Sequence, residues 1–441
     1  MTLFLNKHDI FYKSQYGFRV RRSTEQAILD IVSKIQANMD LGMFSCGIFI
    51  DLQKAFDTVD HSILLHKLNH YGIRGVVNDW FSSYLSGRVQ TTQIGSYISQ
   101  KEKTLCGVPQ GSVLGPLLFL IYISDIYNAS DKLAFYLFAD ETNLLFADRN
   151  LKSLETMVNR ELMNVYDWLA SNKLSLNVKK TNFVIFHPSQ KRLNYKVNLK
   201  IYDNNRKHLI CLERKDYVKY LGVLIDSNLT WKHHISHIAS KISKSVGITC
   251  RLRHLAPFST LLNIYRSLIY PYLSYGLVAW GQAAKSHMEK ILILQKRVVR
   301  LMNFANYNSH AVPYFISANV MPINMLYVKL SSLLMRHVHN NLISFNLSGM
   351  PTLSHQIHKH NTRSSSAGNY YINFSRLNQN QNSFSRTGCK IWNSFTGNLR
   401  NLPKHIFKEK ITKILFQNLQ VQDSYVDVEQ IISDMSKVKP S

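Results

Sequence analysis

Two apolar stretches that end in acidic residues constrain the fold of this chain more than any other feature. The first, Gly47-Ile-Phe-Ile-Asp51, is continuously apolar and predicts a buried strand with a carboxylate at its end. The second, residues 132–146, alternates like a hairpin and carries Asp140 and Glu141 at its tip. Asp51 and Asp140 are 89 residues apart, so only folding can bring them together. We expect their carboxylates to lie within about 8 Å of each other, where they can hold two divalent cations.

Helix and strand patterns mix without strict alternation over residues 1–228. Ser23-Thr-Glu-Gln26 has the spacing of a capping box and predicts the start of a helix. Asp57 and Asp60 are both expected to cap a helix that begins near His61. Residues 89–106 suggest a hairpin, and apolar positions from 151 to 169 mark a long amphipathic helix. This mixture predicts an α+β fold with an antiparallel centre.

The pattern changes after residue 228. Residues 229–345 have helical periodicity throughout and predict an all-helical region. Residues 346–441 are rich in Asn, Ser, His and Arg in their first part and have weak periodicity, so their fold is not assigned. We therefore expect three parts, with boundaries at residues 228 and 345.

The charge is concentrated in one part of the chain. The formal net charge is +26, and between Asp226 and Glu409 there are 21 Lys and Arg against a single acid, Glu289. Aromatic residues and histidines lie among these cations, which is the composition of a polyanion-binding surface. A basic face kept for solubility is the alternative, although solubility does not require near-exclusion of acids.

Cysteine use and hydropathy indicate a compartment. None of the five cysteines forms a CxxC pair, so neither a zinc knuckle nor a disulfide framework is indicated. The longest apolar run, residues 114–123, is about half of a membrane span. With no signal peptide recognisable at the start, we expect an intracellular protein of the nucleus, the cytoplasm or both, with no membrane association. No protein partner can be inferred.

Five further blocks occur in a fixed order around the two acidic stretches. They are Gln15-Tyr-Gly-Phe-Arg19 with Ser23-Thr24, Gly107-Val-Pro-Gln-Gly-Ser-Val-Leu-Gly-Pro116, Leu176-Asn-Val-Lys-Lys-Thr181, Tyr220-Leu-Gly-Val-Leu-Ile-Asp226 and Leu273-Ser-Tyr-Gly-Leu-Val-Ala-Trp280. In this order, over residues 15–280, the set resembles the reverse transcriptase of non-LTR retrotransposons, most of all that of the jockey-like insect elements.

The resemblance implies both an architecture and a reaction. A right-hand polymerase palm with partial fingers would occupy residues 1–228, a helical thumb 229–345 and a basic segment of unknown fold 346–441. The activity would be RNA-directed DNA polymerisation, in which dNTPs are added to a primer 3′-hydroxyl by two-metal phosphoryl transfer. The implied cofactor is Mg²⁺ as two ions, with Mn²⁺ as an alternative. The implied partners are an RNA template, a DNA primer and dNTPs.

The resemblance makes Asp51, Asp140 and Glu141 the metal ligands. The alternative is that these acids serve as helix caps or turn residues. Glu141 departs from the family, which has Asp at this second tip position. Its extra methylene moves the carboxylate by about 1 Å, and such a displacement can cost on the order of a hundredfold in rate.

Other site residues follow from the same blocks. Phe56 would lie under the incoming sugar and exclude a 2′-hydroxyl, or else it packs in the core. Gln110 and Gly111 would contact template and nucleotide, unless they form only a turn into a helix. Lys180 would donate a proton to pyrophosphate, or it is an ordinary surface lysine.

The remaining site residues concern the primer and phosphate. Tyr220, Leu221 and Gly222 would grip the primer end, with a simple edge hairpin as the alternative. Arg19 and Arg21 would face phosphate or serve at the surface. His233, His234 and His237 have a spacing that suits a metal, but no fourth ligand is nearby, which favours backbone contact or solvent exposure.

The family places a longer stretch of fingers before the first block, whereas fourteen residues precede it here. We therefore expect an N-terminally truncated copy in which this loss and Glu141 together leave little or no primer extension. A catalytically inactive remnant that only binds nucleic acid is the alternative from another class. An intron-type maturase has the same palm, but the blocks at Tyr220 and Tyr275-Gly276 disfavour it.

Overall fold

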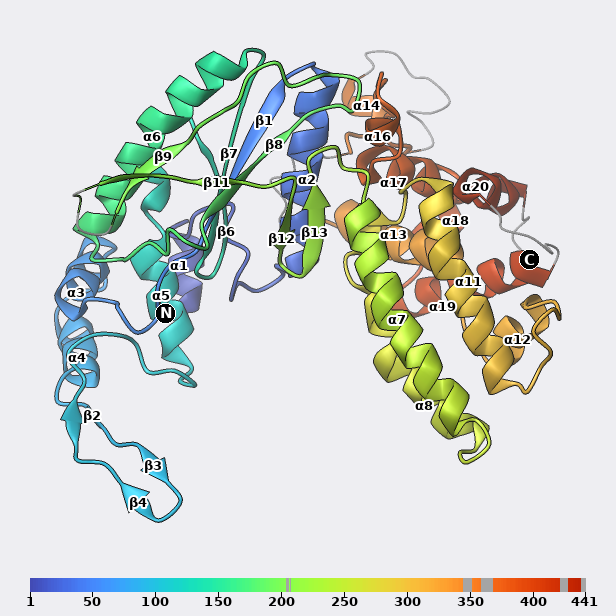
Figure 1. The fold of residues 1–441 in the computed structure, drawn as a ribbon, viewed down its shortest axis with the longest axis horizontal. Helices are drawn as coiled ribbons and strands as arrows, with labels where there is room; N and C mark the ends of the chain where they lie inside the picture. Colours follow the sequence, from blue (N-terminus) through green and yellow to red (C-terminus); the bar gives the residue numbers. More distant parts are fainter. Residues whose placement is uncertain (204–205, 207, 344–350, 358–367, 421–426, 438–441) are drawn as a thin grey trace. The chain divides into compact units, whose positions relative to one another are not determined.

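The computed structural model describes residues 1–203, 206, 208–343, 351–357, 368–420 and 427–437 (Figure 1). Two compact units emerge from its contacts. The first comprises Met1–Ala27 and Gly42–Asp216, and the second Ile28–Leu41 and Tyr217–Ser441. Helix α2 (Thr24–Asp40) therefore contributes residues to both. The expected division into palm, thumb and C-terminal segment, with boundaries at residues 228 and 345, stays a prediction.

A five-stranded sheet forms the centre of the first unit. Its order is β11-β8-β1-β7-β6, and every pairing is antiparallel except that of β11 with β8. All seven residues of β1 are buried, as expected for a central strand covered on both faces. The predicted α+β fold with an antiparallel centre is confirmed. The strands are β1 (Phe44–Ile50), β6 (Ala134–Phe138), β7 (Glu141–Asp148), β8 (Asn182–Phe186) and β11 (Glu213–Arg214).

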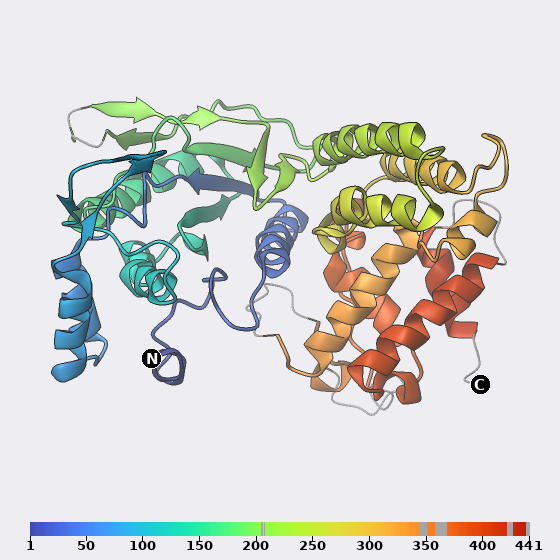
Figure 2. The ribbon, with the colours of Figure 1, turned by 90° about the horizontal axis from the view of Figure 1, so that it is seen from below.

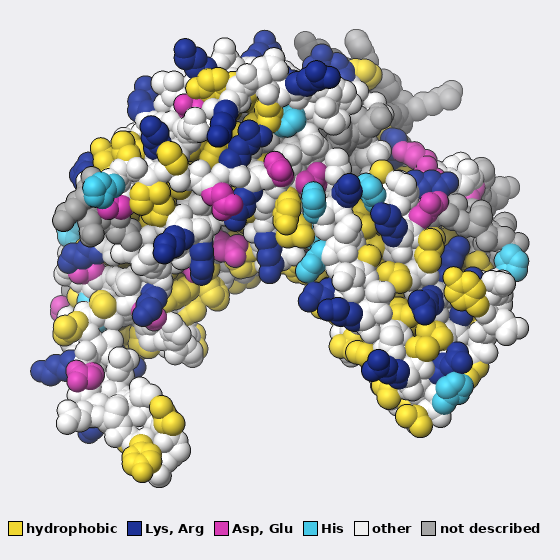
Figure 3. Space-filling view, in the orientation of Figure 1, with side chains coloured by type: hydrophobic (Ala, Val, Ile, Leu, Met, Phe, Trp, Pro, Cys, Tyr) yellow, Lys and Arg dark blue, Asp and Glu magenta, His cyan; other side chains and the backbone are white. Residues whose placement is uncertain are grey.

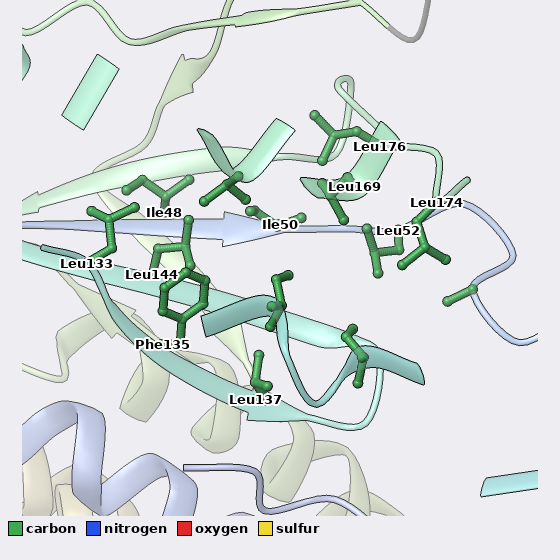
Figure 4. Close-up of a cluster of buried hydrophobic side chains, with 14 of the residues drawn as sticks. Ile48, Ile50, Leu52, Leu133, Phe135, Leu137, Leu144, Leu169, Leu174 and Leu176 are labelled. Carbon is green, nitrogen blue, oxygen red and sulfur yellow. The ribbon is translucent and has the colours of Figure 1, made fainter. Parts of the chain in front are cut away.

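Helices of the first unit bury their apolar sides around this sheet. Helix α6 packs against β7, and its apolar positions from Leu151 to Leu169 are buried as the periodicity predicted. Past the end of β1, Leu52 meets Leu174 and Leu176 (Figure 4). Burying such a side chain contributes about 1.5–3 kcal/mol, so this cluster fixes the backbone on both sides of Asp51. The helices are α1 (Thr2–Lys7), α3 (His61–His70), α4 (Val76–Leu85), α5 (Leu114–Ile123) and α6 (Leu151–Ser171).

The helix caps differ in one respect from expectation. Ser23 and Gln26 form the predicted reciprocal capping box, with Gln26 N donating to Ser23 Oγ at 3.3 Å and Ser23 N donating to Gln26 Oε1 at 3.1 Å. Asp60 caps α3 by accepting from Ile63 N at 3.0 Å. Its hydrogen bonds from Lys173 and Ser62 hold the pKa of Asp60 well below its usual range. Asp57 does not cap this helix, because its carboxylate instead accepts from the side chain of Gln110.

A narrow hairpin projects from the end of α4. The outer pair β2 (Val89–Gln90) and β5 (Glu102–Lys103) and the inner pair β3 (Gln93–Ile94) and β4 (Tyr97–Ile98) confirm the predicted hairpin around Gly95 (Figure 1). The first unit also holds the short pair β9 (Lys200–Tyr202) and β10 (Leu209–Cys211) and the 3₁₀ turn Ile126–Ala129.

The regular elements in the described residues of the second unit are helices and one hairpin, which consists of β12 (Tyr217–Tyr220) and β13 (Val223–Asp226). Figure 2 shows α7, α8 and α11 on one side of the second unit and the helices from α13 onward on its other side. This confirms the helical periodicity of residues 229–343, the described part of the predicted region. The helices are α7 (Lys232–Leu252), α8 (Phe258–Leu268), α9 (Tyr270–Ser274), α10 (Leu277–Trp280), α11 (Lys285–Met302), α12 (Val312–Ser317) and α13 (Ile323–His339).

Helix α13 is the buried centre around which the C-terminal residues fold. Trp392, Phe407, Ile411 and Leu415 are fully buried, and α17 and α19 pack directly on α13. Phe407, Ile411 and Leu415 are spaced by four residues, and this spacing indicates the helix of residues 404–420. The polar composition of the C-terminal segment obscured that pattern. Residues 346–350, 358–367, 421–426 and 438–441 lie outside the described part. The elements are α14 (Ser354–Ile357), α16 (Asn378–Gln381), α17 (Phe384–Asn393), α18 (Gly397–Arg400), α19 (Lys404–Gln420) and α20 (Val428–Lys437).

Among the residues just described, none of the helices has the length and apolar character needed to cross a membrane.

Candidate active site

Strand register brings the two acidic stretches of the sequence together. Ile50 at the end of β1 pairs with Thr142 on β7, and Glu141 pairs with Phe138 across the hairpin. Asp51 therefore follows β1 at the point where the β6–β7 hairpin turns through Ala139 and Asp140. The two predicted ligands lie on adjoining strand ends, although their role in binding metal stays a prediction.

The turn that carries Asp140 is held in an unusual conformation by Gln15. Ala139 has φ +54, which is uncommon for a residue with a side chain. The Oε1 atom of buried Gln15 accepts from Ala139 N at 3.0 Å and from Gly17 N at 2.8 Å. Tyr16 N donates to Leu137 O at 2.8 Å, so the block that starts at Gln15 runs alongside β6. The sequence contained this block, but nothing in it identified Gln15 as the residue that holds the turn carrying Asp140.

Gly17 allows this close approach. A Cβ atom at Gly17 would lie 2.3 Å from the backbone nitrogen of Ala139, far inside any van der Waals contact. Backbone atoms of a turn cannot move aside as a flexible side chain can. A side chain at position 17 would therefore displace the turn that carries Asp140.

The block from Leu176 to Thr181 is built around Asp51. Asn177 Nδ2 donates to Asp51 Oδ2 at 2.9 Å, and Asp51 N donates to Thr181 Oγ1 at 3.3 Å. Lys180 Nζ lies 3.9 Å from Asp51 Oδ2. The structure thus places Lys180 beside the predicted metal ligand, and it adds Asn177 and Thr181, which the sequence interpretation did not select. Their position in the same short block as Lys180 was the available signal.

The acidic groups of this site are open to solvent. The side chains of Asp51 and Lys180 are 44% and 72% exposed, so their ion pair adds less than about 1 kcal/mol of stability and leaves Lys180 free to move. Asp140 is half-buried and Glu141 is exposed. Within the described ranges, no group of three or more His, Cys, Asp or Glu side chains is arranged to hold a metal ion.

Phe56 and Gln110 come together through backbone pairing of their two blocks. Val108 N donates to Phe56 O at 2.9 Å, and Gln110 Nε2 donates to Asp57 Oδ1 at 2.8 Å. The half-buried ring of Phe56 stacks on Phe119, with ring centroids 4.3 Å apart. This packing coexists with a partly open ring, so both interpretations of Phe56 remain compatible with its position.

Gly111 and Arg19 have different surroundings. Gly111 has φ +79 with open space around it, a conformation that favours glycine. The Arg19 guanidinium donates to Tyr12 O at 3.0 Å and lies over the Phe11 ring at 5.2 Å. Burial and the neighbouring Arg22 lower the pKa of Arg19 to about 10, so it stays charged at neutral pH. Its predicted contact with nucleotide or template stays a prediction.

The predicted primer-gripping residues form a tight hairpin in the second unit. Leu221 and Gly222, with φ of 44 and 84, connect β12 to β13, and two positive φ angles indicate a type I′ turn. Tyr275 Oη donates to Leu221 O at 2.6 Å. The last two sequence blocks are therefore one structural feature, in which Tyr275 supports the turn. Tyr220 itself is 1% exposed, so its ring is part of the core.

His234 is buried behind this hairpin, which its neighbours in sequence did not indicate. Its Nδ1 accepts from Leu224 N at 3.3 Å, and its ring meets Trp280 edge-on at 5.3 Å. Burial, with a smaller contribution from His237, lowers the pKa of His234 to about 4. His233 and His237 are exposed, and the described residues give these three histidines no metal-binding group.

This burial predicts acid sensitivity in the second unit. Because the folded pKa of about 4 lies below the usual value near 6.5, the unfolded chain binds the proton more readily. Stability should therefore be complete above about pH 6.5 and fall by about 3 kcal/mol as the pH approaches 4. Thermal melts between about pH 6.5 and pH 4 should show that the Tm of His234→Gln falls less steeply with decreasing pH than the Tm of the parent chain. The exposed control His233→Gln should keep the parent's slope, and an equal slope for His234→Gln would contradict the assignment.

Comparison with known proteins agrees with this geometry. A sequence model of the family described as reverse transcriptase (RNA-dependent DNA polymerase) matches residues 1–225. The RNA-directed DNA polymerase from mobile element jockey of Drosophila melanogaster is 28% identical over 309 residues, covering 66% of this chain and 32% of that protein. Its counterpart from Drosophila funebris is 25% identical over 305 residues, with coverage of 66% and 32%.

This chain thus spans about a third of the length of those relatives. Among solved structures, telomerase from Candida albicans in complex with the TWJ fragment of telomeric RNA gives a TM-score of 0.41 at 13% identity, covering 74% of this chain and 51% of that one. The family match takes in half of the chain, including the sheet, Asp51 and the hairpin that carries Asp140. The chain therefore belongs to the reverse transcriptase (RNA-dependent DNA polymerase) family, with non-LTR retrotransposon polymerases among its relatives.

Proposed function

We propose that this chain is an RNA-directed DNA polymerase that extends a DNA primer with dNTPs on an RNA template, at a rate that is reduced by Glu141. The observation that carries the proposal is that Asp51, with Lys180 beside it, follows the central strand β1 where the neighbouring β6–β7 hairpin turns through Asp140. Phosphoryl transfer needs little covalent chemistry from the protein, so positioned charges of this kind supply most of the catalysis.

The residues present are compatible with Mg²⁺, with Mn²⁺ as an alternative. Mg²⁺ is usually held by one or two carboxylates together with substrate phosphates. Asp51 uses its Oδ2 atom for Asn177. We propose its other carboxylate oxygen and the carboxylate of Asp140 as the direct ligands, with the Glu141 carboxylate as the third and less direct one. The described residues contain no three-carboxylate group, so phosphates would complete the coordination of the two ions. Bound ions of this kind neutralise phosphate charge and make a hydroxyl a better nucleophile.

The remaining residues would position substrates. Lys180, whose side chain is largely exposed beside Asp51, would donate a proton to the departing pyrophosphate. Phe56 would present its ring to the sugar, and Gln110 with Gly111 would contact the template and the nucleotide. Tyr220, Leu221 and Gly222 would support the primer end.

Basic residues of the second unit would bind the nucleic acid backbone. Lys241 and Lys244 on α7 and Arg297 on α11 are exposed, and Figure 3 shows further Lys and Arg side chains on the surface in view. With 21 basic residues and one acid between Asp226 and Glu409, we propose phosphate-mediated binding of RNA or DNA with little base preference and a strong dependence on salt.

A primer-extension assay tests this function. The unmodified chain is incubated with an RNA template, an annealed DNA primer, dNTPs and Mg²⁺, and dNTP incorporation is measured with and without EDTA. Extension that requires Mg²⁺ and an RNA template supports the proposal. Nucleic acid binding without any extension refutes it for this chain.

The second candidate function is binding without catalysis. It is favoured by Glu141, which replaces the family's second Asp. The two candidates share the basic surface and differ only in catalysis, so the same assay separates them.

We expect Glu141→Asp to raise the rate of primer extension by up to about a hundredfold. The shorter side chain withdraws the carboxylate by about 1 Å toward the turn, and displacements of this size change rates by that factor. Single-turnover extension with saturating dNTP measures the change. The control Glu141→Gln keeps the length and removes the charge. A rate for Glu141→Asp no higher than that of the parent would show that the longer acid does no harm.

A further inference from the structure

A small polar pocket in the second unit has no role in the proposed polymerase site. It has a volume of about 90 Å³ and lies among α2, α17 and the segment of residues 371–375. Its polar lining includes Ser33, Thr352, Asn373, Asn380, Ser385 and Arg386. Among the described residues that line it there is no Asp or Glu, so hydroxyls, amides and one guanidinium define its chemistry.

Arg386 is the only charged group among these lining residues, and it lacks a counter-charge. Its Nε and Nη1 atoms are buried and have no hydrogen-bond partner, and no ion pair to it occurs among the described residues. A buried donor without a partner is destabilising, and a buried charge more so. The planar guanidinium fork matches the oxygens of a carboxylate or phosphate. An anion in the pocket would therefore satisfy groups that the protein leaves unsatisfied.

Asp40, an acid that contacts the wall of this pocket, is already engaged. At the end of α2 it accepts from Ser375 Oγ at 3.0 Å, from Arg376 N at 3.0 Å and from Leu377 N at 3.2 Å. These bonds fix the segment that contributes Ser375 to the lining. Asp40 thus builds the pocket wall, and it makes no ion pair with Arg386.

Size and surroundings indicate what kind of anion fits. Drug-sized ligands occupy about 300–1,000 Å³, so a pocket of about 90 Å³ admits a single phosphate-sized group. The pocket lies at the first turn of the ten-residue helix α17, where the helix dipole favours an anion. Phe374 lies in the lining and is 84% exposed, so its ring is available for stacking on a base.

We propose that this pocket binds one phosphodiester of a single-stranded nucleic acid, with an adjoining base stacked on Phe374. The proposal rests on the nucleic acid binding proposed above for the identity of the strand. It does not depend on polymerase activity. The pocket would serve as a fixed anchoring point, in contrast to the exposed basic side chains of α7 and α11.

The first experiment uses inorganic phosphate and thermal melting of the full chain. Phosphate at a hundredfold excess over its Kd should raise the Tm of the parent chain by about 3 °C, and it should not raise that of Arg386→Gln. The control Arg192→Gln, at an exposed arginine of the first unit, should keep the increase. In phosphate-free buffer Arg386→Gln should melt no lower than the parent, because it removes buried donor atoms that have no partner. A markedly lower Tm there would show a structural role and overturn the proposal.

The second experiment measures single-stranded oligonucleotides of unrelated sequence by fluorescence anisotropy at rising salt. Arg386→Gln should weaken binding about tenfold or more and reduce the salt slope by about 0.7. Arg386→Lys should restore part of this loss, since it returns the charge without the fork. Phe374→Ala should weaken binding about tenfold with an unchanged slope, because stacking is not electrostatic.

The outcomes separate the two proposals. If the parent chain binds no oligonucleotide at any salt concentration, the proposed nucleic acid binding fails, and this inference fails with it. If the parent binds and Arg386→Gln binds equally well with the same slope, only the anchoring pocket is refuted. Phosphate-dependent stabilisation without any effect on oligonucleotide affinity would assign the pocket to free phosphate and overturn the role of the strand.

Discussion

Replacing Asp51 with asparagine should lower primer extension by at least about a thousandfold, equivalent to about 4 kcal/mol of transition-state stabilisation. The change removes one negative charge from the point where β1 meets the Asp140 turn. Metal ligation depends on that charge, and two-metal catalysis stabilises the attacking and leaving oxygens together. The measurement is single-turnover extension on an RNA template with Mg²⁺.

The substitution is structurally conservative at this position. The amide oxygen of asparagine can still accept from Asn177 Nδ2, which donates to Asp51 at 2.9 Å. Folding and RNA affinity should therefore be unchanged. Asp131→Asn, at an exposed acid before β6, is the matched control and should extend primers like the parent. Extension by Asp51→Asn within tenfold of the parent would remove Asp51 from the metal site.

Among glycine-to-alanine substitutions in the first unit, Gly17→Ala should lower both stability and the rate of primer extension the most. The new Cβ atom would lie 2.3 Å from Ala139 N, so the chain must shift at the turn that carries Asp140. Overpacking of this kind costs about 3 kcal/mol. A shift of about 1 Å at a catalytic group costs about a hundredfold in rate. We expect a lower Tm together with slower primer extension.

Gly247→Ala is an informative control for this prediction. Gly247 lies within α7, and a Cβ atom added there would meet no neighbouring atom within 4 Å. Alanine is favoured over glycine in a helix by up to about 1 kcal/mol, so this variant should melt at or above the Tm of the parent. If Gly17→Ala melts and extends like the parent, the turn tolerates displacement, and Gln15 and Gly17 do not position Asp140.

Much of the first unit could be predicted from the sequence because its signals are local. The buried strand, the capping box and the hairpin of residues 89–106 each arise from neighbouring residues whose periodicity or cap chemistry is specific. The bonds between blocks could not be predicted in the same way. Gln15 and Ala139 are held together across 124 residues, and no spacing rule links a glutamine to a distant turn.

The sequence was least informative about the role of Asp57 and about the helix of residues 404–420. Asp57 was expected to cap a helix because its spacing suits a cap, but its carboxylate instead accepts from Gln110 of another block. Residues 404–420 form a long helix although Lys, Asn and Gln interrupt its apolar stripe. Burial against α13 selects that helix. Tertiary contacts decided both cases, and a local pattern contains no information about them.

The shared helix α2 has a consequence for dissecting this protein. The second unit takes residues 28–41 from within the sequence of the first, so no single cut separates the two. A fragment of residues 217–441 would lose Asp40 and leave the backbone nitrogens of Arg376 and Leu377 without their acceptor. A fragment of residues 1–216 would retain a helical segment whose partners are missing. Neither fragment therefore contains all the residues of one unit and only those. The two units must be expressed as one continuous chain.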